Sequence, residues 1–410
     1  MARYIMVQKL CIVIFFLSAC FLGLPLSPCF AVELSGKSAV LINGDTGQVL
    51  FEKDSNLKLY PASTTKILTA LAVLNNVGPD ETVTVSENVE GTDGTSIWLV
   101  GGEQLTVREL LYAMMLNSAN DAALALAEYV GGSQEGFAKM MNGNAQKIGA
   151  QNSNFTNPHG LPDDNHYTTA YDLALIAKEA MKIPKFREIV ATSDYTINRV
   201  DPEAQSLLYN HNRLLNRYEG ANGIKTGYTV AAGQCIVASA IKNGRELIAV
   251  VLGSEGNNVW TDATGLLDYG FDNFNSVPVV ENGCVVSSEV PVKHGLNDAT
   301  AMALKSLYVD VPQGLTPEME QQLYWEEVEA PVERGQVLGV MVVSNGQSEI
   351  GRVDLIAVEE VSRKSAANIW LWAAACIVLA VIILREYGRR KRIRRFIERQ
   401  RYLRQRYQQY

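Results

Sequence analysis

Residues 235–252, CIVASAIKNGRELIAVVL, contain two apolar runs, Cys235–Ala240 and Leu247–Leu252, on either side of Asn243-Gly244. An Asn-Gly pair between two apolar runs is the strongest short-range signal for a tight β-hairpin, because both residues tolerate positive φ angles. Strands that follow each other as hairpins pair in the antiparallel direction. This stretch therefore predicts the central hairpin of an antiparallel sheet.

The sheet is expected to receive strands from both ends of one domain, with helices inserted between them. Near the start of that domain two apolar triplets, 40–42 and 49–51, flank turn residues and predict another hairpin. From Ser63 onward apolar residues recur at helical spacing, and helical patterns continue to about Met181. Residues 32–276 are therefore predicted to form an α+β domain, an antiparallel sheet with flanking and inserted helices.

The pattern changes near residue 277 to short runs of β-like composition, such as 307–311 and 337–343. Asn345-Gly346 is a further hairpin signal in this part of the chain. We expect residues 277–361 to form a small all-β domain.

The N-terminus has the pattern of a secretory signal peptide. Arg3 and Lys9 precede a largely apolar run, and Cys29-Phe30-Ala31 suits cleavage after a small residue. Residues 1–31 are therefore predicted to be a signal peptide. Lipoprotein processing at Cys20 is an open alternative, because Leu17-Ser18-Ala19-Cys20 resembles a lipobox.

Residues 365–384 are free of charged side chains and lie between Lys364 and Arg385. At roughly 1.5 Å per residue, such a helix just crosses a hydrocarbon core of roughly 30 Å. It is predicted to be a transmembrane helix. The tail, residues 385–410, would stay in the cytoplasm by the positive-inside tendency, which leaves the folded domains outside a bacterial cell membrane.

Charge is distributed unevenly along the chain. The net charge is −8, yet the tail carries eleven basic residues against Glu386 and Glu398. The rest of the chain is consequently strongly acidic. This charge argues against nucleic acid as a partner of the exported part. The tail itself is predicted either to lie on anionic lipid or to be a solvated stop-transfer segment.

Three short motifs carry candidate chemistry: Ser63-Thr64-Thr65-Lys66, Ser118-Ala119-Asn120 and Lys225-Thr226-Gly227. Ser-x-x-Lys also occurs at residues 55–58 and 239–242, but only Ser63 follows a proline and opens a helical pattern. A serine and a lysine one helical turn apart face each other. The order, setting and combination of the motifs indicate nucleophilic serine chemistry.

Acyl transfer suggests a role for each residue. Ser63 would be the nucleophile and Lys66 its base, provided that burial and the charge of Lys225 keep Lys66 neutral. Ser118 would pass a proton to the leaving amine. The remaining candidates would bind substrate: Asn120 its amide, Lys225 and Thr226 a terminal carboxylate, Gly227 an extended backbone, and the N–H groups of Ser63 and Tyr228 the oxyanion.

On these motifs, together with Asn157-Pro158-His159-Gly160-Leu161, the chain resembles the D-alanyl-D-alanine carboxypeptidase family of low-molecular-mass penicillin-binding proteins. The similarity covers roughly residues 35–275 and extends more loosely to the β-domain. It implies peptidoglycan stem peptides as substrates, acylation by β-lactams, and no cofactor or metal. Many relatives anchor by an amphipathic C-terminal helix, whereas residues 365–384 resemble a full span.

The few histidines give no independent sign of a metal site. The chain has four histidines and lacks a His-Glu-x-x-His motif, so His159 is expected to shape the site. Two other functions remain open at this point: a serine β-lactamase, which shares the three motifs, and a non-catalytic receptor that β-lactams acylate.

Overall fold

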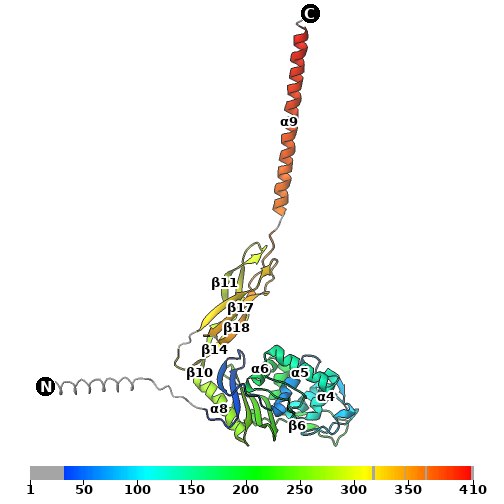
Figure 1. Ribbon diagram of the computed structural model, residues 1–410, viewed down its shortest axis with the longest axis vertical. Coiled ribbons are helices and arrows are strands. Elements are labelled where there is room, and N and C mark those ends of the chain that lie inside the picture. The colour runs from blue at the N-terminus through cyan, green and yellow to red at the C-terminus, as the bar shows by residue number, and fades with distance from the viewer. Residues whose placement is uncertain (1–31, 316–318, 347, 365–366, 408–410) are drawn as a thin grey trace, which may run out of the picture. The chain divides into compact units, whose positions relative to one another are not determined.

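The computed structural model describes residues 32–315, 319–346, 348–364 and 367–407. The predicted signal peptide and the lipoprotein alternative at Cys20 lie outside these residues. The chain divides into two compact units (Figure 1). The first contains the described residues through Val279 together with Tyr308–Glu320 and Val343–Arg352, and the second contains the others.

The first unit is organised around a five-stranded sheet with the order β2-β1-β9-β8-β7. All neighbouring strands are antiparallel, as predicted. Asn243 and Gly244 form the turn between β8 and β9, with φ angles of 53° and 77°. The strands are β1 (Ser38–Asn43), β2 (Val49–Lys53), β7 (Ala221–Thr229), β8 (Gly233–Lys242) and β9 (Arg245–Ser254).

Side chains of the sheet alternate between two hydrophobic cores, because successive residues of a strand point to opposite faces. Val40 and Ile42 belong to the core shared with the inserted helices. Ala39 and Leu41 belong to the other core, which is covered by α8 (Asn258–Asn273). The sheet is therefore buried on both faces, and its edges are the places where a ligand can approach the strands.

Helices fill the segment between β2 and β7, as the sequence predicts, but they continue ten residues beyond Met181. Pro184 stands in the first turn of an additional helix, where its missing N–H is not needed. The helices are α2 (Lys66–Leu74), α3 (Val107–Leu116), α4 (Asn120–Gly131), α5 (Gln134–Ile148), α6 (Ala170–Met181) and α7 (Pro184–Ala191). Short strands and 3-10 helices connect them: β3 (Thr82–Thr84), β4 (Gln104–Thr106), β5 (Asp194–Thr196), β6 (Leu207–Tyr209), η1 (Ala62–Thr65), η2 (Glu87–Val89) and η3 (Arg213–Asn216).

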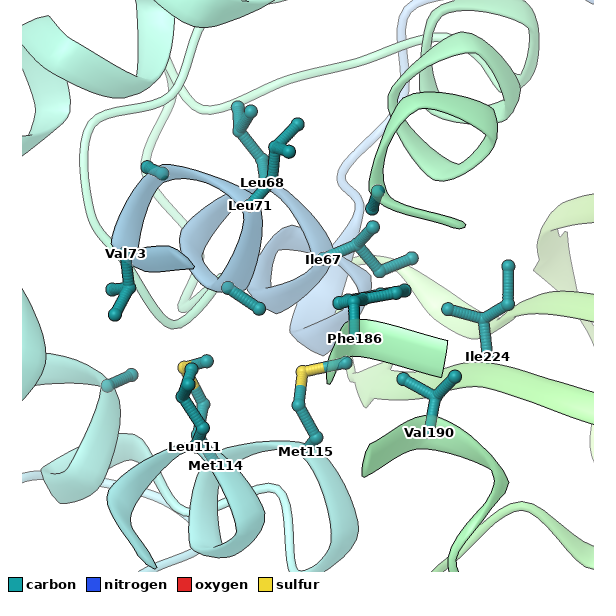
Figure 2. Close-up of a cluster of buried hydrophobic side chains, with 14 of the residues drawn as sticks. Ile67, Leu68, Leu71, Val73, Leu111, Met114, Met115, Phe186, Val190 and Ile224 are labelled. Atoms are coloured by element: carbon teal, nitrogen blue, oxygen red, sulfur yellow. The ribbon is translucent and has the colours of Figure 1, made fainter. Parts of the chain in front are cut away.

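Helix α2 lies at the centre of the larger core. All of its residues from Lys66 to Val73 are buried. In Figure 2 the side chain of Val73 faces Leu111 of α3, whereas that of Ile67 points toward Phe186 of α7. Because α2 is packed on several sides, the residues at its start are held rigidly.

The second five-stranded sheet has the order β11-β13-β18-β17-β15, which confirms the predicted all-β part that follows the first sheet. Its hairpin partners β17 and β18 flank Asn345-Gly346. Its strands are β11 (Val285–Val290), β13 (Ala299–Ala303), β15 (Glu320–Trp325), β17 (Val337–Asn345) and β18 (Ser348–Ala357). Two separate two-stranded sheets pair β10 (Phe274–Val280) with β14 (Leu307–Pro312), and β12 (Val292–Lys293) with β16 (Val328–Glu329).

Helix α9 (Ala367–Tyr407) includes most of the predicted span and continues into the basic tail. Among the described residues it is the one helix long and apolar enough to cross a membrane. Residues 365 and 366 of the predicted span lie outside the described residues.

Candidate active site

Ser63 lies in η1, directly before α2. The chain turns sharply into η1 because Ala62 adopts a φ of 48°. Lys66 is the first residue of α2, three positions after the serine. Its Nζ atom lies 3.0 Å from Ser63 Oγ, which is hydrogen-bonding distance. The turn therefore brings the two predicted residues into direct contact.

The environment of Lys66 disfavours its charged form. The residue has no exposed surface, and its Nζ atom also lies 2.6 Å from Asn120 Oδ1 and 2.9 Å from the carbonyl oxygen of His159. Burial, and then the positive charge of Lys225, hold the pKa of Lys66 well below its usual value of 10.5, against a smaller opposing effect of Asp121. A lysine with a lowered pKa can accept a proton from a hydroxyl group.

Ser118 and Asn120 lie at the junction of α3 and α4. Ser118 has a φ of 61°, which is unfavourable for a residue with a side chain, and it is buried. Asn120 begins α4, and its Nδ2 atom donates to the carbonyl oxygen of Asp93 at 2.7 Å. With its Oδ1 atom on Lys66, the amide of Asn120 has a single orientation.

Lys225, Thr226, Gly227 and Tyr228 lie on β7, the edge strand beside η1. Lys225 is 2% exposed, and burial lowers its pKa to about 7. Within the described part of the chain its ammonium group has no ion-pair or hydrogen-bond partner. A buried cation without a partner is suited to an anionic ligand.

Gly227 lets β7 approach the nucleophile closely. A Cβ atom at this position would lie 2.7 Å from the backbone nitrogen of Ser63 and 3.0 Å from that of Thr64. Distances under 3.0 Å are not tolerated by real Cβ atoms. The glycine is therefore required by the contact between the strand and η1, and Tyr228 follows it as an exposed residue.

Two further residues support the site, although their roles were not predictable from the motifs alone. Gly160 has a φ of 87°, and a Cβ atom there would lie 1.9 Å from the carbonyl oxygen of Ala62. Asp121 is buried and accepts hydrogen bonds from the backbone nitrogens of Ile97 and Leu99 at 3.1 and 3.0 Å. Gly160 lies inside the Asn157–Leu161 phrase and Asp121 directly follows Ser118-Ala119-Asn120, which was the available signal.

The two histidines near the site have structural roles. His159 contributes its backbone carbonyl to Lys66, and burial lowers the pKa of its ring to about 3. His166 Nε2 lies 2.9 Å from Thr65 Oγ1, and burial lowers its pKa to about 4. Both rings are therefore neutral near pH 7. The described residues contain no cluster of three or more potential metal ligands of the His, Cys, Asp and Glu types.

The site combines a buried lysine in contact with a serine hydroxyl and, on the adjacent sheet edge, a lysine without a partner among the described residues. This is the arrangement of a serine acyl-transfer enzyme. The chain belongs to the D-alanyl-D-alanine carboxypeptidase family of serine peptidases, because the family of that description matches residues 27–256. A second match, described as the C-terminal domain of penicillin-binding protein 5, covers residues 274–363.

Individual relatives agree with this assignment. The chain is 35% identical over 337 residues to the D-alanyl-D-alanine carboxypeptidase DacF of Bacillus subtilis, a match that covers 80% of this chain and 86% of the relative. It is 32% identical to DacC of Escherichia coli, with 81% and 85% covered. The solved structure of penicillin-binding protein 5 from Haemophilus influenzae is similar with a TM-score of 0.66 and 29% identity, and 81% of this chain and 98% of that chain are covered. The predicted family and fold are thus confirmed.

Proposed function

We propose that this chain is a serine-type D-Ala-D-Ala carboxypeptidase that removes the terminal D-alanine from the pentapeptide stems of peptidoglycan. The observation that carries the proposal is the 3.0 Å contact between Lys66 Nζ and Ser63 Oγ, with the lysine fully buried and its pKa lowered. This contact supplies both a nucleophile and the base that it needs.

In the proposed reaction, Ser63 Oγ attacks the carbonyl carbon of the penultimate D-alanine while Lys66 takes the hydroxyl proton. The backbone N–H groups of Ser63 and Tyr228 stabilise the oxyanion. The C–N bond then breaks, Ser118 passes the proton taken up by Lys66 on to the leaving amine, and D-alanine departs. Water hydrolyses the ester on Ser63, which releases the shortened peptide and restores the hydroxyl group.

Substrate binding is assigned to the edge of β7 and to Asn120. The unpartnered ammonium group of Lys225, with the Thr226 hydroxyl, binds the terminal carboxylate. Gly227 leaves room for an extended peptide along the strand, and Asn120 hydrogen-bonds the substrate amide. A free C-terminal carboxylate is what separates a carboxypeptidase substrate from an internal peptide bond.

β-Lactams are proposed to acylate Ser63, since they present a strained amide to the same nucleophile. The β-lactamase alternative is less favoured, because the chain matches the carboxypeptidase family and also carries the C-terminal domain of a penicillin-binding protein. The receptor alternative is less favoured because Ser118, the proposed proton donor of the chemical step, is present beside the other reactive residues.

We further propose a membrane-anchored topology. The apolar first half of α9 spans a bacterial cell membrane, and the basic residues 385–410 remain in the cytoplasm. The catalytic domain, proposed as residues 32–276, and the β-domain, proposed as residues 277–361, then face the cell wall, where the stem peptides are.

The test is mass spectrometry of a synthetic pentapeptide ending in D-Ala-D-Ala after incubation with the purified chain in detergent. The wild type is expected to remove one alanine from the peptide. Ser63→Ala is expected to remove none and to lose penicillin labelling. Ser55→Ala is the matched control, because Ser55 begins another Ser-x-x-Lys sequence and should be dispensable. Undiminished labelling of Ser63→Ala would show that the nucleophile is a different residue.

A further inference from the structure

Trp98 is a large aromatic residue held in an unfavourable backbone conformation and yet displayed to solvent. Its φ is 60°, in the left-handed region that residues with a side chain rarely occupy. Its exposed fraction is 70%. Such strain persists only where the surrounding structure determines the conformation, and it often marks functional positions.

Asp121 holds the loop on both sides of Trp98. Its carboxylate accepts from the backbone nitrogens of Ile97 and Leu99, the two neighbours of the tryptophan. Ser96 Oγ donates to the same carboxylate and accepts from the backbone nitrogen of Trp98 at 3.1 Å. The main chain around Trp98 is therefore fixed by hydrogen bonds to one buried acid.

Arg199 lies in the segment after β5, and its side chain binds backbone carbonyl groups of the same loop. Its guanidinium donates to the carbonyl oxygens of Ile97 at 2.6 Å and of Trp98 at 3.0 Å. It also forms two hydrogen bonds of 2.7 Å with the carboxylate of Glu103, and the two side chains are only 2% and 8% exposed. A bidentate pair that is buried to this extent is rigid.

The loop is directly connected to the reactive residues through Asn120. The backbone nitrogen of Asn120 donates to the carbonyl oxygen of Thr95, and its side chain donates to that of Asp93, both at 2.7 Å. A Cβ atom on Gly94 would lie 2.6 Å from Asn120 Nδ2. Trp98 is three residues from Thr95, so it lies at most about 11 Å along the chain from a residue that binds Asn120, the partner of Lys66.

We propose that Trp98 is a specificity-determining residue whose indole packs against the side chain of the diamino residue that precedes the two D-alanines of a stem peptide. This inference rests on the proposed carboxypeptidase function. An indole face binds an aliphatic chain and attracts an amino cation at its end, and both features belong to a diamino residue. Asp121 and the Arg199–Glu103 pair are positioning residues that hold the indole ready without reorganisation on binding.

The experiment compares acetyl-Lys-D-Ala-D-Ala with acetyl-Gly-D-Ala-D-Ala as substrates of the full chain in detergent. The wild type is expected to show a KM about five- to tenfold lower for the lysyl peptide. Trp98→Asn removes the indole and keeps a residue that tolerates positive φ, so the protein should fold normally. We expect this variant to bring the two KM values within about twofold, with kcat for the glycyl peptide unchanged, and Trp98→Phe to keep most of the preference.

Arg199→Met should also reduce the preference for the lysyl peptide. Its matched control is Arg245→Met, which removes an equally well-bonded arginine beside the turn between β8 and β9, where Arg245 binds Asp310 at 3.0 Å. This control should keep the preference. A wild type without preference, or a preference that survives in Trp98→Asn, would overturn the inference. Failure of the wild type to cleave either peptide would instead refute the proposed function.

Discussion

Replacing Gly227 with alanine tests whether the close approach of β7 to the nucleophile matters for the reaction. The new Cβ atom would lie 2.7 Å from the backbone nitrogen of Ser63, whereas ordinary contacts begin at 3.4 Å. The strand or η1 must therefore move by about 0.7 Å. A misplacement of about 1 Å can reduce a rate about 100-fold, so we expect kcat/KM to fall about 10- to 100-fold. The overpacking should destabilise the domain by about 1–3 kcal/mol.

Two measurements separate the effect of Gly227→Ala on catalysis from its effect on stability. The rates of penicillin acylation and D-alanine release report the position of Ser63, and the Tm reports the fold. A variant that retains a cooperative unfolding transition but acylates slowly would support the reasoning. Acylation at the wild-type rate would refute it, because the nucleophile would then tolerate the extra methyl group.

Three further predictions concern charge and helix stability. Burial lowers the pKa of Lys225 to about 7, so its charge is lost as the pH rises through 7 and carboxylate binding weakens. The KM of the wild type should therefore rise about fivefold from pH 7 to pH 8, whereas the KM of Lys225→Arg should not rise. A wild-type KM that stays flat across this range would contradict the assignment. Burial lowers the pKa of His166 from 6.5 to about 4, so the unfolded chain binds a proton below pH 6.5 that the folded chain excludes. From pH 7 to pH 4.5 the wild type should lose about 2–3 kcal/mol more stability than His166→Gln in denaturant titrations, and equal losses would argue against this. Gly143 lies inside α5 with nothing within 4 Å of its missing Cβ, so Gly143→Ala should stabilise the protein by about 0.5–1 kcal/mol, and a lower Tm would be the contrary result.

The parts of the molecule that were predictable from sequence depend on short-range relations. The Asn243-Gly244 hairpin was recognisable because its turn type requires residues that accept positive φ, which the structure confirms. The contact between Ser63 and Lys66 was predictable because three positions within one turn bring two side chains together. The family resemblance then supplied the expected order of the motifs along the fold.

The supporting structure of the site was not predictable in this way. Arg199 and Glu103 are 96 positions apart, and neither belongs to a recognisable motif. The left-handed φ angles of Ser118 and Trp98 contradict the local preferences of serine and tryptophan. The conformation of Trp98 is maintained by the hydrogen bonds that Asp121 accepts from the backbone nitrogens of Ile97 and Leu99, and by the one that Arg199 donates to the carbonyl oxygen of Trp98.

By itself, the sequence determined the antiparallel α+β fold, the reactive residue types and their order, because hairpin turns, helical periodicity and motif spacing act over a few residues. Only the tertiary structure decided that Lys66 is fully buried with Asn120 on its Nζ atom, that Lys225 has no ion-pair or hydrogen-bond partner among the described residues, and that Gly160 must lack a side chain. The physical reason is that desolvation and close approach arise from long-range packing, which no local pattern of residues specifies.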